Sequence, residues 1–446
     1  LSSCTEDEQS VKNTCNWGAK THNDLPNSVG GFGNGGFYSA QSTQDIVNSI
    51  KYFIEDIRPR FKPVATGSPT LPVDALNPIQ LQPYGYYANF TPKPQSSYQL
   101  WLGNLNKYHI YNGELYNSVK TIKLILDNGR INTNDQGIFG GEGVSGKIPL
   151  RDGLNTEGTQ YSKRQVFTNR QITNGVVSES SDLQVVDLET LFSADTSKAK
   201  FANDPKKNYW LNVLGYGVGE NQTNVTQASL AGIPEVRQMG AVMHSKPLLL
   251  TQEGKVVASK VTGSTKPVIT STDRKDYLLY GTNQGMLHVV YVGKDTDDDR
   301  GKEVFTFIPN EMMENQYKGF LAEGNTNGGR QNLYYGIDGT WTSHTQYVSK
   351  TDGSLTVKDS GRKDNDGKDL DLKGLQWVYG GLRMGGRSYY ALDLSTIDKP
   401  TLKFHINPTG TGSDSNPLGY MGESWSKPTV TWVNWGGTRK LVMFVG

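Results

Sequence analysis

The chain has 446 residues and a formal net charge of +1, with 45 Lys and Arg against 44 Asp and Glu. This balance gives no overall electrostatic field, so we expect no nucleic acid partner and no binding to an acidic membrane surface. The sequence has no run of about 18 apolar residues, and we therefore expect no helical membrane span. Its 51 glycines and 23 tyrosines favour an all-β protein that is rich in tight turns.

Two cysteines, Cys4 and Cys15, are the only ones in the chain and lie close together near its start. Their spacing does not match a zinc site, which would need further Cys or His ligands nearby. We expect a disulfide that closes this short loop, and with it an oxidising compartment outside the cytoplasm. Two free thiols in a frayed terminus are the alternative.

The segment 42–57 has the clearest helical pattern. A capping-box-like start at Ser42-Thr-Gln-Asp45 precedes apolar residues at helical spacing. These residues are Ile46, Val47, Ile50, Phe53, Ile54 and Ile57. We expect the helix to end at Arg58, because the residue before a proline is pushed out of the α region. Six prolines then follow up to Pro83 and forbid a helix, so we expect residues 61–83 to be a Pro-rich linker.

From Tyr84 onward, short apolar runs alternate with Gly, Asn, Asp and Pro, which is typical of many short strands. The runs are 84–90, 98–102, 120–126, 164–168, 242–250, 255–261, 277–281, 286–292, 304–308, 333–335, 345–348, 375–379, 388–393, 429–433 and 439–445. The stretch from Ser181 to Trp210 breaks this period, and we expect one or two helices there. Residues 280–292 and 378–393 repeat one unit, in which a Gly turn joins two strands. The repeat favours a β-propeller, while a sandwich or another β architecture stays open at this point.

The loop at 293–303 is dense in carboxylates and joins two predicted strands. Its candidate ligands are Asp295, Asp297, Asp299 and Glu303, at relative positions 1, 3, 5 and 9, and the backbone carbonyl of Gly301. Ca²⁺ takes about 6–8 oxygen ligands at about 2.3–2.6 Å, so this spacing lets several oxygens converge on one ion. We therefore predict a calcium site formed by these five residues. The alternative is a solvated acidic turn, since clustered Asp is common in hairpin loops.

A second acidic cluster spans residues 364–371. A calcium loop that began at Asp364 would place Lys368 at its fifth position and Leu375 at its twelfth. Neither side chain offers the oxygen ligand that calcium needs at those positions. We therefore expect this cluster to be an exposed loop without a metal.

Several motifs occur in the same order as in one known bacterial family. They are Met243-His-Ser-Lys-Pro247, Gly281-Thr-Asn-Gln-Gly-Met-Leu-His288, Phe307-Ile-Pro309, Ile337-Asp-Gly339, Gly380-Gly-Leu-Arg-Met-Gly-Gly-Arg387, Tyr390-Ala-Leu-Asp393 and Ser424-Trp-Ser-Lys-Pro428. As an ordered set they resemble the C-terminal region of the PilC/PilY family, the tip-associated proteins of type IV pili. Residues 30–57 are similar to the last strand and helix of the von Willebrand factor A-like domain that precedes the propeller in some members. Two positions depart from the family pattern: Arg383 stands where Gly is usual, and Trp425 where Phe or Thr is common.

The resemblance implies a fold, a function and partners. It implies a β-propeller, complete or incomplete, at 84–446, a linker at 61–83, and the end of a von Willebrand factor A-like domain with the disulfide loop at 1–60. It implies an exported, non-enzymatic protein at the bacterial surface, the pilus tip or the outer membrane. There it would act in adherence, pilus biogenesis and twitching motility with calcium-dependent regulation, and it would contact minor pilins and a host-cell receptor.

Two other functions stay open. Propellers of quinoprotein dehydrogenases carry similar Gly-Thr-x-x-Gly-x-Leu-His strands, but the adjacent cysteine pair that many of them use is missing here. A carbohydrate-binding propeller is the other alternative, although no clustered set of Trp, Asn and Asp marks a sugar site. We interpret His244 and His288 as buried structural imidazoles, because no acid or nucleophile lies near either in the sequence. We expect Arg387 to pair with a carboxylate after the tight turn at Gly385-Gly386.

Overall fold

The computed structural model describes residues 64–65, 69–92, 100–126, 131–132, 136–154, 160–260, 267–322 and 333–446, with a few single residues before them. Contacts divide the chain into two compact units, Leu1–Lys62 and Pro63–Gly446, and the description below concerns the second unit. Cys4 and Cys15, the helix predicted at 42–57 and the von Willebrand factor A-like segment lie outside the described residues. They therefore stay predictions.

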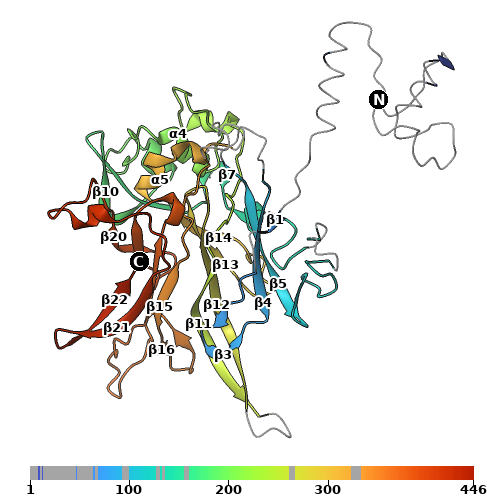
Figure 1. Ribbon diagram of the computed structural model, residues 1–446, viewed down its shortest axis with the longest axis vertical. Helices are drawn as coiled ribbons and strands as arrows, with labels where there is room; N and C mark the ends of the chain where they lie inside the picture. The colour runs from blue at the N-terminus through green and yellow to red at the C-terminus, as the bar shows by residue number, and fades with distance from the viewer. Residues whose placement is uncertain are drawn as a thin grey trace. The chain divides into compact units, whose positions relative to one another are not determined.

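The largest sheet has eight strands in the order β10-β9-β14-β13-β12-β11-β17-β16 (Figure 1). The strands are β9 (Val166–Thr173), β10 (Val176–Val185), β11 (Leu248–Ser259), β12 (Val268–Gly281), β13 (Leu287–Tyr291), β14 (Glu303–Phe307), β16 (Val348–Ser349) and β17 (Leu355–Thr356). Every neighbouring pair is antiparallel except β14 and β9, which run parallel. Strands β11 to β14 are consecutive neighbours and form an antiparallel meander.

A second sheet is an antiparallel meander of four strands, β15 (Thr342–Gln346), β18 (Leu375–Gly381), β19 (Tyr389–Asp393) and β20 (Thr401–Ile406). The repeated unit found in the sequence forms the central hairpin of each meander, β12–β13 in the first and β18–β19 in the second. Four-stranded antiparallel meanders are the blades of propellers. The described strands thus show two such blades within a curled mixed sheet, but not a closed ring.

The N-terminal part of this unit forms a smaller four-stranded sheet in the order β1-β4-β5-β6. Its strands are β1 (Val64–Ala65), β4 (Tyr84–Phe90), β5 (Gly103–Tyr111) and β6 (Glu114–Tyr116), and a hairpin of β2 (Val73–Asp74) and β3 (Asn77–Leu81) lies nearby. Two further hairpins pair β7 (Arg151–Leu154) with β8 (Gln160–Ser162), and β21 (Thr429–Trp435) with β22 (Thr438–Phe444). Residues 61–83, predicted as a linker, therefore include three short strands of the folded unit.

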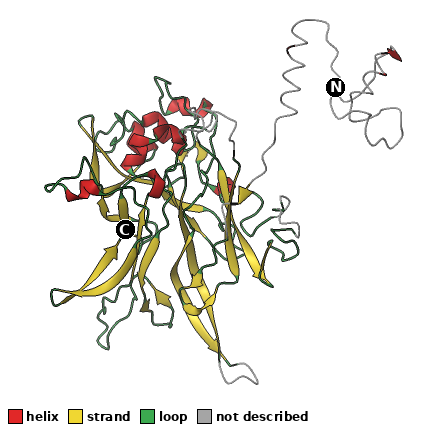
Figure 2. Ribbon diagram, in the orientation of Figure 1, coloured by secondary structure: helices red, strands yellow, loops and turns green. Residues whose placement is uncertain are grey.

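The helices of the described part are short and gather mainly at one end of the strands (Figure 2). They are the α-helices α3 (Leu188–Phe192), α4 (Lys207–Val213) and α5 (Asn310–Asn315), and the 3-10 helices η1 (Ser145–Lys147), η2 (Ala228–Gly232), η3 (Tyr317–Phe320), η6 (Arg383–Gly385) and η7 (Pro417–Tyr420). Helix α3 begins with a capping box, in which the Asp187 carboxylate accepts from the Thr190 N–H and the Thr190 hydroxyl accepts from the Asp187 N–H. The two α-helices between 181 and 210 confirm the helices predicted there.

Both faces of the β12–β13–β14 hairpins are buried, which explains why their sequence is apolar at nearly every position. Alternate residues such as Leu279, Val289 and Phe305 pack with Trp210 of α4 in the larger core. Their neighbours Leu278, Tyr280 and Val290 face the opposite side and form a second core, together with Tyr86, Leu105 and Phe139. The smaller sheet therefore covers one face of the first blade and holds β4 and β5 next to β12.

Most predicted strands overlap observed ones. Strand β4 has the predicted bounds 84–90, whereas residues 120–126 form only isolated bridges and residues 333–335 form no strand. Strand β10 was missed because its sequence, Val176-Val-Ser-Glu-Ser-Ser-Asp-Leu-Gln-Val185, is mostly polar and largely accessible to solvent. A strand that buries little apolar surface leaves little signal in its own sequence.

Candidate functional site

The acidic loop joins β13 to β14 and is held closed by backbone hydrogen bonds at its base. The Gly301 N–H donates to the Tyr291 carbonyl at 2.8 Å, and the Tyr291 N–H donates to the Lys302 carbonyl at 2.9 Å. Gly301 has a φ of +80°, and a Cβ at this position would lie 2.8 Å from the Phe139 ring. Only glycine satisfies both demands without strain, so Gly301 fixes the path of the loop.

Asp297 and Asp299 lie at the tip of this loop. The Asp297 carboxylate accepts a hydrogen bond from the Lys294 N–H at 2.8 Å and another from the Tyr291 hydroxyl at 2.9 Å. These hydrogen bonds lower the pKa of Asp297 below its usual value. Asp299 is 71% exposed and forms an ion pair with Lys302 at 3.0 Å. Both carboxylates are thus at least partly accessible to solvent.

Asp295 turns away from the loop tip toward the smaller sheet. It forms an ion pair with Lys107 of β5 at 2.8 Å and accepts a hydrogen bond from the Tyr84 hydroxyl of β4 at 3.1 Å. The Lys107 ammonium also lies 3.9 Å from the centre of the Tyr84 ring. Burial lowers the pKa of Lys107, and the Asp295 carboxylate opposes this shift.

Glu303 points in the opposite direction, into the core. Its side chain is fully buried and receives two hydrogen bonds from Arg164, at 2.7 and 3.0 Å, and one from His288 at 2.5 Å. Burial alone would raise the pKa of Glu303, but the Arg164 charge and the His288 hydrogen bond outweigh it and lower the pKa to about 2. His288 is therefore a buried structural residue, as predicted, with a carboxylate as its partner.

The five predicted calcium ligands do not converge in this structure. They are Asp295, Asp297, Asp299, Gly301 and Glu303, and they divide between the smaller sheet, the loop tip and the core. Across the part of the chain that the structure describes, no group of three His, Cys, Asp or Glu side chains is placed to hold a metal ion. This arrangement does not fit one ion held by all five residues, since Arg164 and His288 already engage Glu303. Calcium binding stays a prediction.

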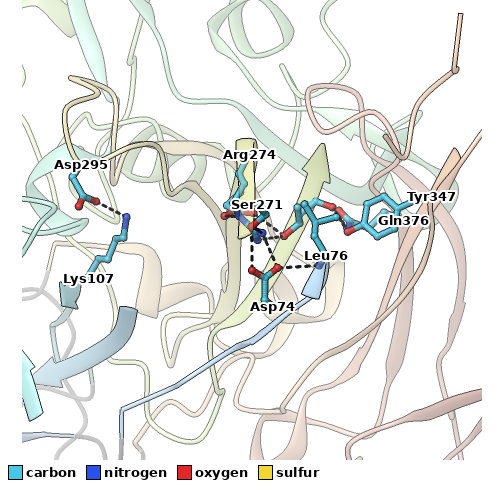
Figure 3. Close-up of polar contacts among 10 residues, drawn as sticks. Asp74, Leu76, Lys107, Ser271, Arg274, Asp295, Tyr347 and Gln376 are labelled. Atoms are coloured by element: carbon cyan, nitrogen blue, oxygen red, sulfur yellow. Dashed lines mark hydrogen bonds and ion pairs between the residues drawn. The ribbon is translucent and has the colours of Figure 1, made fainter. Parts of the chain in front are cut away.

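A cavity of about 590 Å³ lies between the base of the acidic loop, the smaller sheet and strand β12. It is lined by Asp74, Gln82, Pro83, Tyr84, Tyr86, Lys107, Ser271, Thr272, Asp273, Arg274, Asp276, Val292, Gly293, Lys294, Asp295 and Thr296. Figure 3 shows its two charged walls, with Lys107 and Asp295 on one side and Arg274 with Asp74 on the other. Its volume lies within the range of about 300–1,000 Å³ that is usual for small-molecule sites.

Arg274 organises the second wall of the cavity. Its guanidinium donates to Asp74 at 2.6 Å, to Asp276 at 2.8 and 3.1 Å, and to the Thr251 hydroxyl at 2.9 Å. The Thr251 carbonyl in turn accepts hydrogen bonds from Tyr347 and Gln376, which belong to the second blade and its approach (Figure 3). The wall is therefore a connected polar network, whose members hold one another in fixed positions.

Four of the sequence motifs meet at a different place. The buried carboxylate of Asp338 accepts from His244 Nδ1 at 2.8 Å and from the Arg383 guanidinium at 2.8 Å. The Arg383 guanidinium lies 4.8 Å from the centre of the Trp425 ring, which is 53% exposed. His244, expected to be buried, has a side chain that is 46% exposed, so that prediction was wrong. The fold brings the Asp338 carboxylate close to His244, and this carboxylate holds the imidazole at the surface.

The two departures from the family pattern contact each other here. Arg383 has a φ of +53°, in the left-handed region that disfavours side chains, which explains why glycine suits this position. The strain is offset by the ion pair with Asp338 and by the cation–π contact with Trp425. Arg387 behaves differently from the prediction, because it donates to the backbone carbonyls of Met421 and Gly419 and not to a carboxylate.

Residues 253–436 match the family model of the PilY1 beta-propeller domain. This stretch is a PilY1 propeller domain. The match covers the first blade from within β11 onward, the whole second blade and strand β21, and it confirms the resemblance found in the motifs. No curated protein and no solved structure is significantly similar to the chain.

Residues 253–436 are thus similar to a domain of a type IV pilus-associated family. The family consists of type IV pilus adhesins that are generally non-enzymatic and act at the cell surface. Among the described residues, no helix is long and apolar enough to cross a membrane. The adhesive role, the partners and the calcium dependence of this particular chain are taken up below.

The cavity residues were missed by sequence reasoning because they come from distant segments. Lys107 meets Asp295 across 188 positions, and Asp74 meets Arg274 across 200. Of these four residues only Asp295 lies in a motif, the acidic loop, and its partner Lys107 does not. Asp338 did carry a signal, since it is the central residue of Ile337-Asp-Gly339, but its role depends on the approach of His244 and Arg383.

Proposed function

We propose that this PilY1 protein is a tip-associated adhesin of type IV pili, which promotes adherence and takes part in pilus extension and retraction. The observation that carries the proposal is the match of residues 253–436 to the PilY1 propeller, over strands that form two blades. Its partners would be minor pilins at the pilus tip and a receptor on the host cell. A surface with polar cavities and exposed aromatic residues, such as Trp425, suits recognition of this kind.

The proposal is tested in the bacterium that encodes the protein. Deletion of the gene should reduce surface pili, twitching and adherence to host cells, and expression of the wild-type gene should restore all three. A strain that lacks the major pilin is the control for complete loss of pili, twitching and adherence. Unchanged piliation, twitching and adherence in the deletion strain would refute the adhesin function.

No observation favours the quinoprotein alternative. The charged groups inside the cavity are held in ion pairs, such as Arg274 with Asp74 and Asp276. A general acid or base needs a free position to accept or donate a proton. We therefore expect no alcohol- or sugar-dependent dye reduction, with or without added quinone.

Calcium-dependent regulation is part of the proposal and rests on the acidic loop. Asp297 and Asp299 are accessible to a cation. For all four carboxylates to bind one ion, Asp295 would have to leave Lys107, and Glu303 would have to leave Arg164. Binding would therefore rearrange the loop against the smaller sheet. The chemistry that calcium would supply is neutralisation of clustered carboxylates that repel each other.

Calorimetry with CaCl₂ on the whole chain tests the site. Wild type should bind, and the double variant Asp297→Ala, Asp299→Ala should not. The matched control is Asp364→Ala with Asp366→Ala in the second acidic cluster, which removes two exposed carboxylates and should leave binding unchanged. Equal calcium affinity in the two double variants would place the ion elsewhere.

A further inference from the structure

The cavity beside Arg274 contains a buried hydroxyl that lacks a partner. Tyr86 is 1% exposed, lines the cavity, and its hydroxyl oxygen has no hydrogen-bond partner. The charges that act on this hydroxyl are those of Asp276, Arg274 and Asp295, all of which line the same cavity. A buried O–H without an acceptor costs free energy, so a molecule with an oxygen acceptor is expected to fill the space before it.

The charges of the cavity limit what that molecule can be. Four carboxylates line it, Asp74, Asp273, Asp276 and Asp295, against the three cations Lys107, Arg274 and Lys294. The two buried cations are already paired, Arg274 with Asp74 and Asp276, and Lys107 with Asp295. An anion would meet an excess of negative charge and no free cation in the interior, so an anionic ligand is disfavoured.

Two further ligand classes fail on other grounds. An ammonium group offers donors only, and it would leave the Tyr86 hydroxyl without an acceptor. An apolar molecule would have to remove several charged side chains from water without replacing their hydrogen bonds, which is unfavourable. What remains is a neutral molecule with many hydroxyl groups, because each hydroxyl is both a donor and an acceptor.

We propose that this cavity binds a neutral saccharide. The Tyr86 hydroxyl donates to a sugar oxygen, and the carboxylates of Asp276 and Asp295 accept from sugar hydroxyls with the lone pairs that Arg274 and Lys107 leave free. Tyr84 lies at the same wall and supplies an aromatic ring edge beside the sugar. Burial raises the pKa of Tyr86 well above its usual value, so its phenol stays protonated and remains a donor at every physiological pH.

This site deepens the adhesin proposal, since it names the kind of host molecule that the protein would recognise. The saccharide site can be tested apart from the adhesin proposal, because sugar binding is measured on the purified chain and pilus function is measured in the cell. A chain that binds neutral glycans while its deletion leaves pili and adherence unchanged would overturn the adhesin proposal alone. A deletion phenotype without glycan binding would overturn the saccharide site alone.

The test compares two tyrosines that are neighbours on β4. Tyr86→Phe removes the hydroxyl in the cavity, and Tyr87→Phe removes one from the opposite face of the strand, where Tyr87 packs with Tyr108 and Leu115. The probe is an array of neutral oligosaccharides of glucose, galactose, mannose and N-acetylhexosamines, with sialylated and sulfated glycans as a second arm. The strongest neutral glycan is then titrated by calorimetry.

Wild type and Tyr87→Phe should bind the same neutral glycans, and Tyr86→Phe should bind them about tenfold more weakly, the loss expected for one hydrogen bond. The melting temperature of Tyr86→Phe should not fall, because the hydroxyl it lacks has no protein partner. Three results would overturn the site: no neutral glycan bound by wild type, equal affinity in wild type and Tyr86→Phe, or preference for the anionic glycans.

Discussion

Glu303 contributes to the fold through a buried ion pair and not through exposed charge. Arg164 and His288 surround its carboxylate in the interior of the first blade. Removing one partner of a buried pair is costly because the other charge is left without compensation. The same residue was predicted as a calcium ligand from its spacing, so its structural role can be separated from that of the exposed Asp299 by mutation.

Glu303→Gln should lower the free energy of unfolding by about 3–5 kcal/mol, the usual effect of breaking a buried pair. The matched control Asp299→Asn neutralises an exposed carboxylate in the same loop, and it should change stability by less than about 0.5 kcal/mol. Urea unfolding of both variants without calcium measures the difference. Similar small effects in the two variants would contradict the structural role of Glu303.

The pH dependence of that difference has a definite sign. The folded pKa of Glu303 is lowered to about 2 from its ordinary value of 4.5, so its stabilisation is complete above pH 4.5 and is lost as the pH falls toward 2. The stability difference between wild type and Glu303→Gln should therefore shrink between pH 4.5 and pH 3. A difference that stays constant over this interval would show that Glu303 has no lowered pKa.

Arg383 places a strained backbone and a favourable ion pair in one residue. Gly at this position would remove the cost of a left-handed conformation, about 1–2 kcal/mol for a residue with a side chain. It would also leave the buried Asp338 with His244 as its remaining partner, which costs about 1–3 kcal/mol or more for a charged group. The second effect should prevail, since Asp338 is almost fully buried.

We therefore expect Arg383→Gly to destabilise the protein by about 1 kcal/mol in urea unfolding. The control is Lys120→Gly, at an exposed residue with a φ of +58°, where strain is relieved and no buried group loses a partner. That variant should be stabilised by about 0.5–1 kcal/mol. Stabilisation in both variants would show that the Arg383 ion pair contributes little.

At the scale of elements, a buried serine hydroxyl accepts from a backbone N–H at or just after the end of β12 and of β18. Ser245 precedes β11 and accepts from the Gly281 N–H at 2.8 Å, and Ser424 precedes β21 and accepts from the Leu382 N–H at 2.8 Å. Both serines are buried: Ser245 is part of Met243-His-Ser-Lys-Pro247, and Ser424 is the first residue of Ser424-Trp-Ser-Lys-Pro428. Each motif thus contributes a serine, at a different position of the motif, that satisfies a backbone N–H where the first strand of a central hairpin ends.

Ser245→Ala and Ser424→Ala should each cost about 1–3 kcal/mol, because each leaves a buried backbone N–H without an acceptor. Ser413→Ala, which removes a hydroxyl from a more accessible turn before η7, should change stability by less than about 0.5 kcal/mol. Thermal unfolding of the three variants checks the set. A loss in only one of the two motif variants would contradict this shared role.

The elements could be predicted where their own sequence carried the pattern. Strands β12, β13 and β14 have apolar residues on both faces, and β18 and β19 repeat their unit, so both central hairpins were recognised. Strand β10 could not be recognised, because its serines and other polar residues leave no apolar pattern. The short strands within 61–83 could not be recognised because the segment is rich in proline. Proline removes backbone donors but is tolerated beside short or edge strands.

The candidate sites, like the elements, could be predicted only where the local sequence carried a pattern. Local spacing predicted an acidic loop, and that loop exists at 293–303, but spacing cannot tell which way each side chain turns. Asp295 turned to Lys107 and Glu303 to Arg164 because their partners come from strands far away in the chain. The saccharide cavity depends entirely on such distant pairs, so only the folded structure could reveal it.

At the scale of the whole molecule, the central proposal is that this protein lies at the pilus tip. Its propeller strands match the PilY1 family, and the polar cavity next to the acidic loop gives that surface a means of recognition. Binding partners at a pilus tip would meet this surface far from the cell, where a rigid β-sheet scaffold holds its recognition groups in place.

The most direct test is immunogold electron microscopy of intact and sheared pili, with antibody against the purified chain. We predict label at pilus tips, recovery of the protein in the sheared pilus fraction, and loss of both signals in the deletion strain. A protein that remains entirely with the cells, with pili unlabelled along their length and at their tips, would contradict its role as a pilus-tip adhesin.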